Sequence, residues 1–216
     1  MSFNFLENKK RREVLFSPPI GLSLLLDAYE VIDQGVRISI SKEERKGKKL
    51  ACSKGCFHCC KTHRDIPLYP HEITGIYWYV LEKFPPSLKE TLTLQLLAHK
   101  SSHNQFCPFL IDGLCSIHII RPAACRLFNV FNRACYPEED PFYTRKEDVL
   151  IPPRDILWKA FLLVLPFYNI QVSGKDTFRA RVMIEEFIHT QAISLHKFDW
   201  GPLGRRLLSH HQKVAK

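Results

Sequence analysis

The sequence lacks a long apolar run. Its most apolar segment, Ile156 to Tyr168, contains Lys159 and falls short of the roughly 20 residues that a membrane-spanning helix needs. The first residues are basic and include no apolar stretch of signal-peptide length. We therefore expect a cytoplasmic protein with no membrane span.

The sequence also lacks low-complexity segments, and its only internal repetition is a division of the cysteines into four plus four. No series of alternating strands and helices is predicted, which argues against an α/β fold. A length of 216 residues suits one domain, 1–216, with a cysteine-rich core at 52–135 and flanking helices in 1–51 and 136–216. The predicted fold is mainly α: a compact helical domain with an irregular cysteine-rich metal-binding centre and at most a short β-hairpin.

Apolar residues at helical spacing predict an amphipathic helix over about residues 20–40. Pro70 suits the first turn of a second helix, and the sequence FPPS is expected to end it. Ser87 with Glu90 is typical of a capping box for a third helix, which is expected to run to about residue 100. The second and third helices should form an antiparallel hairpin that returns the chain to the first cysteine group.

Local signals also predict structure after the second and third helices. The Asp-Gly step at 112–113 indicates the turn of a short hairpin, and Pro122 suits the start of a short helix that carries Cys125. Two packing helices are expected farther on, one from about Pro153 and one over about 176–195. The expected buried face of the last helix comprises Phe178, Val182 and Phe187.

Clustered cysteines are the strongest chemical signal. The segment CSKGCFHCC, residues 52–60, holds four of the eight cysteines. In a reducing compartment clustered thiols indicate metal or redox chemistry rather than disulfides. The candidate metal ligands are Cys52, Cys56, Cys59, Cys60, Cys107, Cys115, Cys125 and Cys135.

The spacing within the first group leaves the number of metal centres open. Cys52, Cys56 and Cys59 would share one face of a helix, but Gly55 favours a loop that wraps a metal. The adjacent side chains of Cys59 and Cys60 do not converge on one ion, so the pair suggests two coordination spheres or different irons of one cluster. Eight thiols would suffice for two four-coordinate sites, or for one cluster with additional buried or redox-active cysteines.

A Cys-x3-Cys-x2-Cys spacing also occurs in radical S-adenosylmethionine enzymes. The chain has no predicted strand before the motif and no strand-helix alternation after it, so we interpret the match as a coincidence of spacing. Nearby histidines could replace a thiolate on zinc. The first of these is His58, and the others are His63, His71, His103 and His118. With enough cysteines available, none is assigned as a ligand.

Basic residues surround the cysteines. Arg121 and Arg126 flank Cys125, and each could donate to a thiolate, reach a bound anion or hold backbone carbonyls together. We expect them to support the site from outside the ligand set. The net charge of +9 is compatible with a nucleic-acid partner, but thiolate ligands would offset part of that charge. A protein or redox partner is therefore favoured over nucleic acid.

The chain resembles a known family at these residues. The segment CSKGCFHCC followed by CPFLIDGLCSIHIIRPAACRLF is similar to YkgJ-type cysteine-cluster proteins, the CxxCxxCC family, described as zinc- or iron-chelating. The resemblance covers residues from Cys52 to about Cys135 and implies metal binding through the eight cysteines. A related pattern occurs in flagellin lysine N-methylases, which look like iron-sulfur proteins that use S-adenosylmethionine. This chain shows no Gly-rich nucleotide loop.

We expect a cysteine-ligated iron-sulfur cluster, a 4Fe-4S cluster, with a redox or electron-transfer role. One alternative is a zinc-stapled structural or interaction module. Another is an iron-sulfur enzyme or accessory protein related to protein lysine N-methylation. The sequence leaves enzymatic activity, substrate, partner and oligomeric state open.

Overall fold

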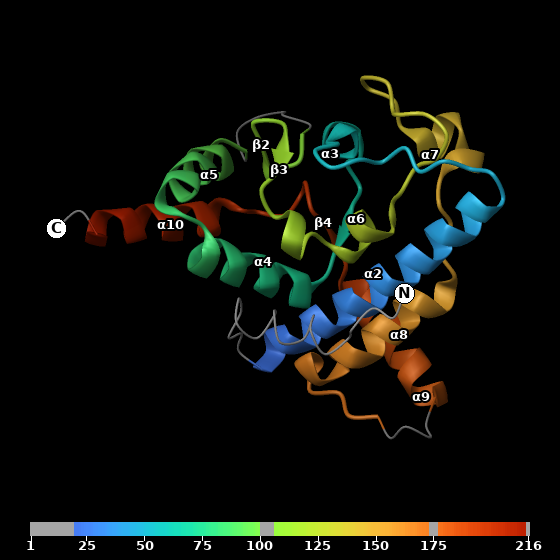
Figure 1. The fold of residues 1–216 in the computed structure, drawn as a ribbon. Coiled ribbons are helices and arrows are strands. Elements are labelled where there is room, and N and C mark those ends of the chain that lie inside the picture. Colours follow the sequence, from blue (N-terminus) through green and yellow to red (C-terminus); the bar gives the residue numbers. More distant parts are fainter. Residues whose placement is uncertain (1–19, 100–105, 173–176, 215–216) are drawn as a thin grey trace.

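The computed structural model describes residues 20–99, 106–172 and 177–214. It is mainly helical, as the sequence predicts, with two sheets of two short strands each. Figure 1 shows the long helix α2 lying beside α8, with α4, α5 and α10 gathered at one end and the cysteine-bearing segments above α2. No helix in the described part of the chain has both the length and the apolar character needed to cross a bilayer.

Helix α2 spans Ile20–Arg45 and so extends the predicted helix by about one turn. Leu25, Tyr29 and Ile32 point into the core and are at most 2% exposed. The helix ends in a Schellman motif: the N–H of Gly47 donates to the carbonyl of Glu44, and the next N–H donates to the carbonyl of Glu43. Gly47 has φ +93°, which glycine adopts without steric cost. This stop turns the chain toward the cysteine loop.

Helix α8, Arg154–Val164, packs along α2 and confirms the helix expected from about Pro153. The two helices approach closely at Gly35, where a Cβ atom would lie 2.5 Å from Cδ1 of Ile156. The following segment forms a 3-10 turn, Leu165–Tyr168.

Helix α4 spans Pro70–Lys83 and begins at the predicted proline. Helix α5 spans Pro86–His99. Ser87 therefore lies inside α5, and the predicted capping box is wrong because Pro86 already occupies the first turn. The predicted packing of the two helices as a hairpin is also wrong: α4 packs against α2, whereas α5 packs against the C-terminal helix α10, Gly201–Val214. The apolar face of α5 is taken up by α10, an element that the sequence analysis did not predict.

The segment after residue 176 is helical but irregular. Helix α9, Thr177–Val182, continues into a π-helical segment, Met183–Ile188, and a 3-10 turn, His189–Gln191. The predicted buried face is wrong, since Phe178 is 78% exposed and Phe187 is 43% exposed. The buried positions are Ala180, Ile184 and Ile188.

Two short sheets complete the fold. Strands β2 (Leu110–Ile111) and β3 (Leu114–Cys115) form the predicted hairpin. Both residues of its Asp112-Gly113 turn have positive φ, 48° and 72°, as a type I′ turn requires. A second sheet pairs β1 (Pro67–Leu68) with β4 (Ile193–Ser194); the sequence analysis missed it because the two partners lie far apart in the chain.

Candidate metal centre

The first cysteine is positioned by a backbone ladder between two remote segments. Leu50 pairs with Phe131 as an antiparallel bridge, and the N–H of Ala51 donates to the carbonyl of Val130 at 2.8 Å. The N–H of Val130 in turn donates to Sγ of Cys52 at 3.3 Å. The ladder therefore fixes Cys52 beside the segment that leads to Cys135.

The cysteine motif itself is a loop followed by one helical turn. Gly55 has φ +85°, and the N–H of Cys56 donates to the carbonyl of Ser53 at 3.1 Å. The short helix α3, His58–Thr62, then carries Cys59 and Cys60. Cys52, Cys56 and Cys59 do not share a helix face, which agrees with the loop expected from Gly55.

The second cysteine group returns to α3. The N–H of Cys107 donates to the carbonyl of Cys60 at 2.7 Å, and Cys115 pairs with Leu110 in the hairpin. The thiol of Cys60 lies within hydrogen-bonding reach of the thiols of Cys107, Cys115 and Cys59. The predicted return of Cys107 to Cys60 is confirmed, although α4 and α5 do not pack on each other.

Cys125 lies on the expected short helix, α6, Ala123–Leu127, which begins directly after Pro122 rather than with Pro122 in its first turn. The helix is anchored by a fully buried carboxylate, because the N–H of Ala123 donates to Oε1 of Glu72 at 2.7 Å. Burial raises the pKa of the Cys125 thiol well above its ordinary value, and the nearby thiols of Cys107, Cys59 and Cys115 raise it further. Cys125 is thus a partly buried member of the group around Cys60.

Cys135 occupies a different environment. Nη2 of Arg145 lies 3.8 Å from its Sγ. Arg145 is 5% exposed and is held by Glu139 at 2.9 Å and Asp148 at 3.0 Å. It also donates to the carbonyls of Phe131 and Arg133. Sequence spacing gave no signal for Arg145, because its partners come together only through the folded loop.

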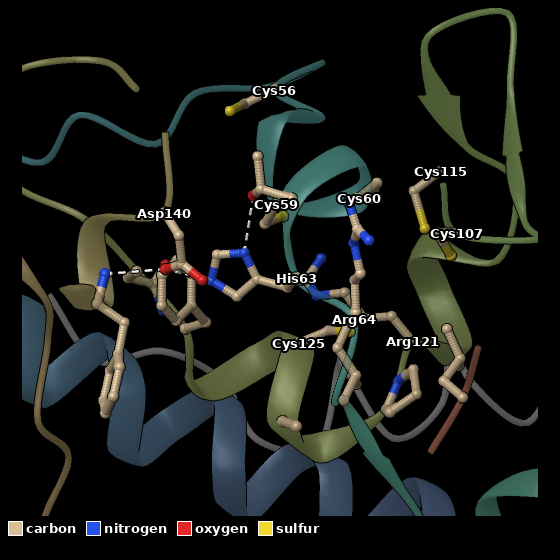
Figure 2. A pocket seen from close by; sticks show the side chains of 18 of the residues that line it. Cys56, Cys59, Cys60, His63, Arg64, Cys107, Cys115, Arg121, Cys125 and Asp140 are labelled. Carbon is tan, nitrogen blue, oxygen red and sulfur yellow. Dashed lines mark hydrogen bonds and ion pairs between the residues drawn. The ribbon is translucent and has the colours of Figure 1, made fainter. Parts of the chain in front are cut away.

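A cavity of about 590 Å³ opens beside the cysteines (Figure 2). Seven of the eight cysteines contribute to its wall; Cys135 lies outside the lining. In Figure 2, Cys60, Cys107 and Cys115 lie on one side, Cys125 lies below Cys59, and Cys56 lies apart. The cavity combines clustered thiols with the apolar side chains of Ile117 and Phe128.

The thiols of Cys59, Cys60 and Cys115 differ in how readily they lose their protons. The pKa of Cys59 is lowered to about 7, chiefly because the Cys60 thiol donates a hydrogen bond to it. The pKa of Cys115 is lowered for the same reason. The pKa of Cys60 is raised by the hydrogen bonds of its own thiol with Cys107, Cys115 and Cys59. Away from this group, burial raises the pKa of Cys52 to about 11. Proton sharing of this kind brings thiolate character to the cavity wall, and thiolate is the form that binds metals.

The two predicted arginines, Arg121 and Arg126, make different contacts in the structure. Arg121 lines the cavity, and its positive charge contributes to lowering the pKa values of Cys59 and Cys115. Arg126 forms an ion pair with Asp33 at 2.7 Å and donates to the carbonyl of Arg121 at 2.9 Å. Arg126 therefore holds backbone and helices together, and Arg121 is the one whose charge acts on the thiols.

A second arginine, Arg64, lines the cavity without having been singled out in the sequence. Arg64 lies four residues after Cys60, beyond the end of α3 at Thr62, and Figure 2 places it between α3 and Cys125. Helical spacing could not have indicated it, because Arg64 lies outside α3.

Of the candidate histidines, some line the cavity and others do not. His63 and His118 line the cavity. Nε2 of His63 lies 3.5 Å from Asp140, and His118 contacts the guanidinium of Arg121. His58 stacks on the ring of Phe57. His71 is hydrogen-bonded to Tyr168 at 2.7 Å and is not part of the cavity wall. His103 lies outside the described residues.

The donor atoms surround a space rather than converge on one point. Within residues 20–99, 106–172 and 177–214, no three His, Cys, Asp or Glu side chains are already placed to hold a single metal ion. Four thiolates around one zinc would lie about 3.8 Å from each other, given Zn–S bonds of about 2.3 Å in a tetrahedron. Binding therefore requires either rotation of the cysteine side chains or a larger, multi-metal group between them.

Comparison with known proteins gives one match. Residues 51–148 match the family model CxxCxxCC, described as "Putative zinc- or iron-chelating domain". No curated protein matches, and no solved structure matches. The matched region contains all eight cysteines, together with the β2–β3 hairpin and Arg145.

Proposed function

Since residues 51–148 are a domain of the CxxCxxCC family, we propose that this chain holds a cysteine-ligated 4Fe-4S cluster and uses it in electron transfer. The proposed ligands are the thiols of Cys60, Cys107, Cys115 and Cys125. The family description supports metal binding, by zinc or iron. The choice of a cluster and its redox role are our proposal.

One observation carries the proposal: thiols from three separate segments meet at one wall of a cavity. Cys60 comes from α3, Cys107 and Cys115 flank the β2–β3 hairpin, and Cys125 comes from α6. Cys107 is 7% exposed, and Cys125 is partly buried beside the other thiols. A compact motif with remote partner cysteines is typical of cluster ligation.

Charge supports the same assignment. A 4Fe-4S cluster with four thiolates carries about two negative charges in its oxidised state, and burying that charge is costly without compensation. Arg64 and Arg121 place two cations at the cavity wall. The aromatic ring of Phe109 and the side chain of Ile117 are fully buried nearby and would limit access of water to the cluster.

The arginines should tune the cluster potential. A nearby cation stabilises the reduced, more negative state, so Arg121→Gln is expected to lower the midpoint potential and leave the iron content unchanged. Arg181→Gln is a matched control, because Arg181 forms an exposed ion pair with Glu185 on α9 and does not line the cavity. An unchanged potential in Arg121→Gln would place Arg121 too far from the electron-accepting group to act on it.

The redox role is tested by an anaerobic reductive titration followed by visible absorption and electron paramagnetic resonance. We expect a broad absorbance near 400 nm that bleaches on reduction and returns on reoxidation. We also expect Cys60→Ser to abolish it. A colourless protein containing zinc and no sulfide would contradict the proposal and support a zinc-stapled module.

The cavity favours one second candidate, an iron-sulfur enzyme related to protein lysine N-methylation. A volume of about 590 Å³ falls within the range of small-molecule sites, and a bound cluster would occupy one wall. Equilibrium dialysis of the metal-loaded chain with radiolabelled S-adenosylmethionine tests this candidate. Saturable binding that is lost in Arg121→Gln would favour the enzyme, and no binding would leave electron transfer as the proposed role.

A further inference from the structure

The eight cysteines fall on two separate backbone scaffolds. One scaffold joins α3 to the hairpin segment through the backbone bond from Cys107 to Cys60 and continues along the chain to α6; it carries the four proposed cluster ligands. The other is the ladder between Leu50 and Phe131, which carries Cys52 at one arm and leads to Cys135 on the other. The two scaffolds meet at α3, where Cys59 and Cys60 are adjacent.

From this arrangement we propose that Cys52, Cys56, Cys59 and Cys135 form a second thiolate metal centre, separate from the first, that takes a single thiophilic ion such as zinc or ferrous iron. The inference rests on the proposed function for the identity of the first centre. It goes beyond that function in assigning the remaining four cysteines to a site of their own.

Helix α3 explains how neighbouring cysteines can serve different centres. Successive side chains on a helix point about 100° apart. Cys60 is turned toward Cys107 and Cys115, within hydrogen-bonding reach of both. Figure 2 shows Cys59 between Cys56 and the Cys60 side of the cavity, and its thiol also lies within hydrogen-bonding reach of the Cys60 thiol.

The cysteine thiols also fall into two sets according to which other thiols act on them electrostatically. The thiol partners of Cys52 are Cys56, Cys59 and Cys135, and those of Cys135 are Cys56 and Cys59. The thiol partners of Cys125 are Cys107, Cys59 and Cys115. Cys59 is the one member common to both sets, and four-coordination of the first centre by the other four thiols leaves Cys59 to the second.

Hydrogen-bond donors are already aimed at two of the proposed ligands. Val130 N–H donates to Cys52 at 3.3 Å, and Arg145 approaches Cys135 at 3.8 Å. Donors of this kind stabilise thiolates that bind metal. Arg145 is 5% exposed and held by two carboxylates and two carbonyls, so this donor is fixed in place before any ion binds.

The second centre differs from the first in exposure. Cys56 is exposed, whereas Cys107 is buried. Closing the site needs rotation of the cysteine side chains, since the thiols do not yet converge. Binding one divalent ion converts four thiols to four thiolates and releases four protons to solvent, with no change in oxidation state. An exposed ligand lets a chelator reach this ion first.

Native mass spectrometry of anaerobically purified protein tests the inference. We expect two bound groups of different mass in the wild type. Cys135→Ser should lose the single ion and keep the group bound by the first centre. Tyr136→Phe is the matched control, because its 63% exposed side chain adjoins Cys135 in sequence and its hydroxyl is the only atom lost; it should keep both groups.

A second measurement needs no variant. The wild type is treated with increasing EDTA, and newly accessible thiols are alkylated and mapped. Cys52, Cys56, Cys59 and Cys135 should become reactive together, before Cys60, Cys107, Cys115 and Cys125. If all eight thiols became reactive in one phase, or if native mass spectrometry found a single bound group, the inference would be overturned.

The outcomes separate this inference from the proposed function. Two zinc ions without sulfide would refute the iron-sulfur proposal and support two centres. One 4Fe-4S cluster with no second group would support the proposed function and refute the second centre.

Discussion

Glu72 gives the sharpest prediction about the scaffold of the site. Its carboxylate is fully buried and connects three elements. Oε1 accepts from the Tyr29 hydroxyl on α2 at 3.1 Å and from the N–H of Ala123 on α6 at 2.7 Å. Oε2 accepts from the N–H of Tyr69 at 3.1 Å, at the start of α4. Through Ala123, Glu72 fixes the helix that carries Cys125.

Burial raises the pKa of Glu72 from 4.5 to about 7, although its hydrogen bonds and the charge of Arg126 act in the opposite direction. In the unfolded chain the carboxyl ionises near its ordinary value, while in the folded chain it stays protonated to higher pH. Stability from this group is therefore fully present below pH 4.5 and is lost as the pH rises through about 7. The loss amounts to roughly 2–3 kcal/mol between pH 5 and pH 8.

The test is urea denaturation of the wild type and Glu72→Gln at pH 5, 6, 7 and 8, with equal metal content. Gln is neutral throughout, so the free energy of unfolding of the wild type minus that of the variant should fall by roughly 2–3 kcal/mol across this range. Glu82→Gln, at an exposed position of the same helix, is the matched control. A difference for Glu72→Gln that stays constant from pH 5 to pH 8 would refute the reasoning.

Two glycine pairs give further predictions. Gly35→Ala should reduce the free energy of unfolding by about 1 kcal/mol or more, since its Cβ would lie 2.5 Å from Ile156 and overpacking outweighs the gain in helix propensity; chemical denaturation measures this. Gly21→Ala on the same helix has ordinary contacts and should stabilise by about 0.5–1 kcal/mol, so equal effects of the two changes would contradict the close approach. Gly55→Ala and Gly47→Ala should each cost about 1–2 kcal/mol, because both residues have positive φ. Only Gly55→Ala should also lower the metal content, measured by elemental analysis, and equal metal loss in both would refute a local role of the loop.

Features set by neighbouring residues could be predicted from the sequence. The start of α4 at Pro70 depends on proline geometry. The β2–β3 turn depends on the positive φ of Asp112 and Gly113. The long amphipathic helix α2 shows its pattern over many turns. In each case the deciding interactions lie within a few residues.

Features set by remote partners could not be predicted. The packing of α5 is decided by α10, about 100 residues later, and the π-helical segment, Met183–Ile188, shifts the buried face that a regular helix would present. The same division holds at the site. Spacing identified the eight cysteines as candidate ligands, but the ladder beside Cys52 and the donor Arg145 depend on contacts across 78 and 10 residues.

The most direct test of the central claim is the iron and acid-labile sulfide content of the anaerobically purified chain, measured beside Cys107→Ser. The account predicts about four irons and four sulfides in the first centre of the wild type and loss of both in the variant. Zinc without sulfide in the wild type, or the same iron and sulfide content in both proteins, would contradict it.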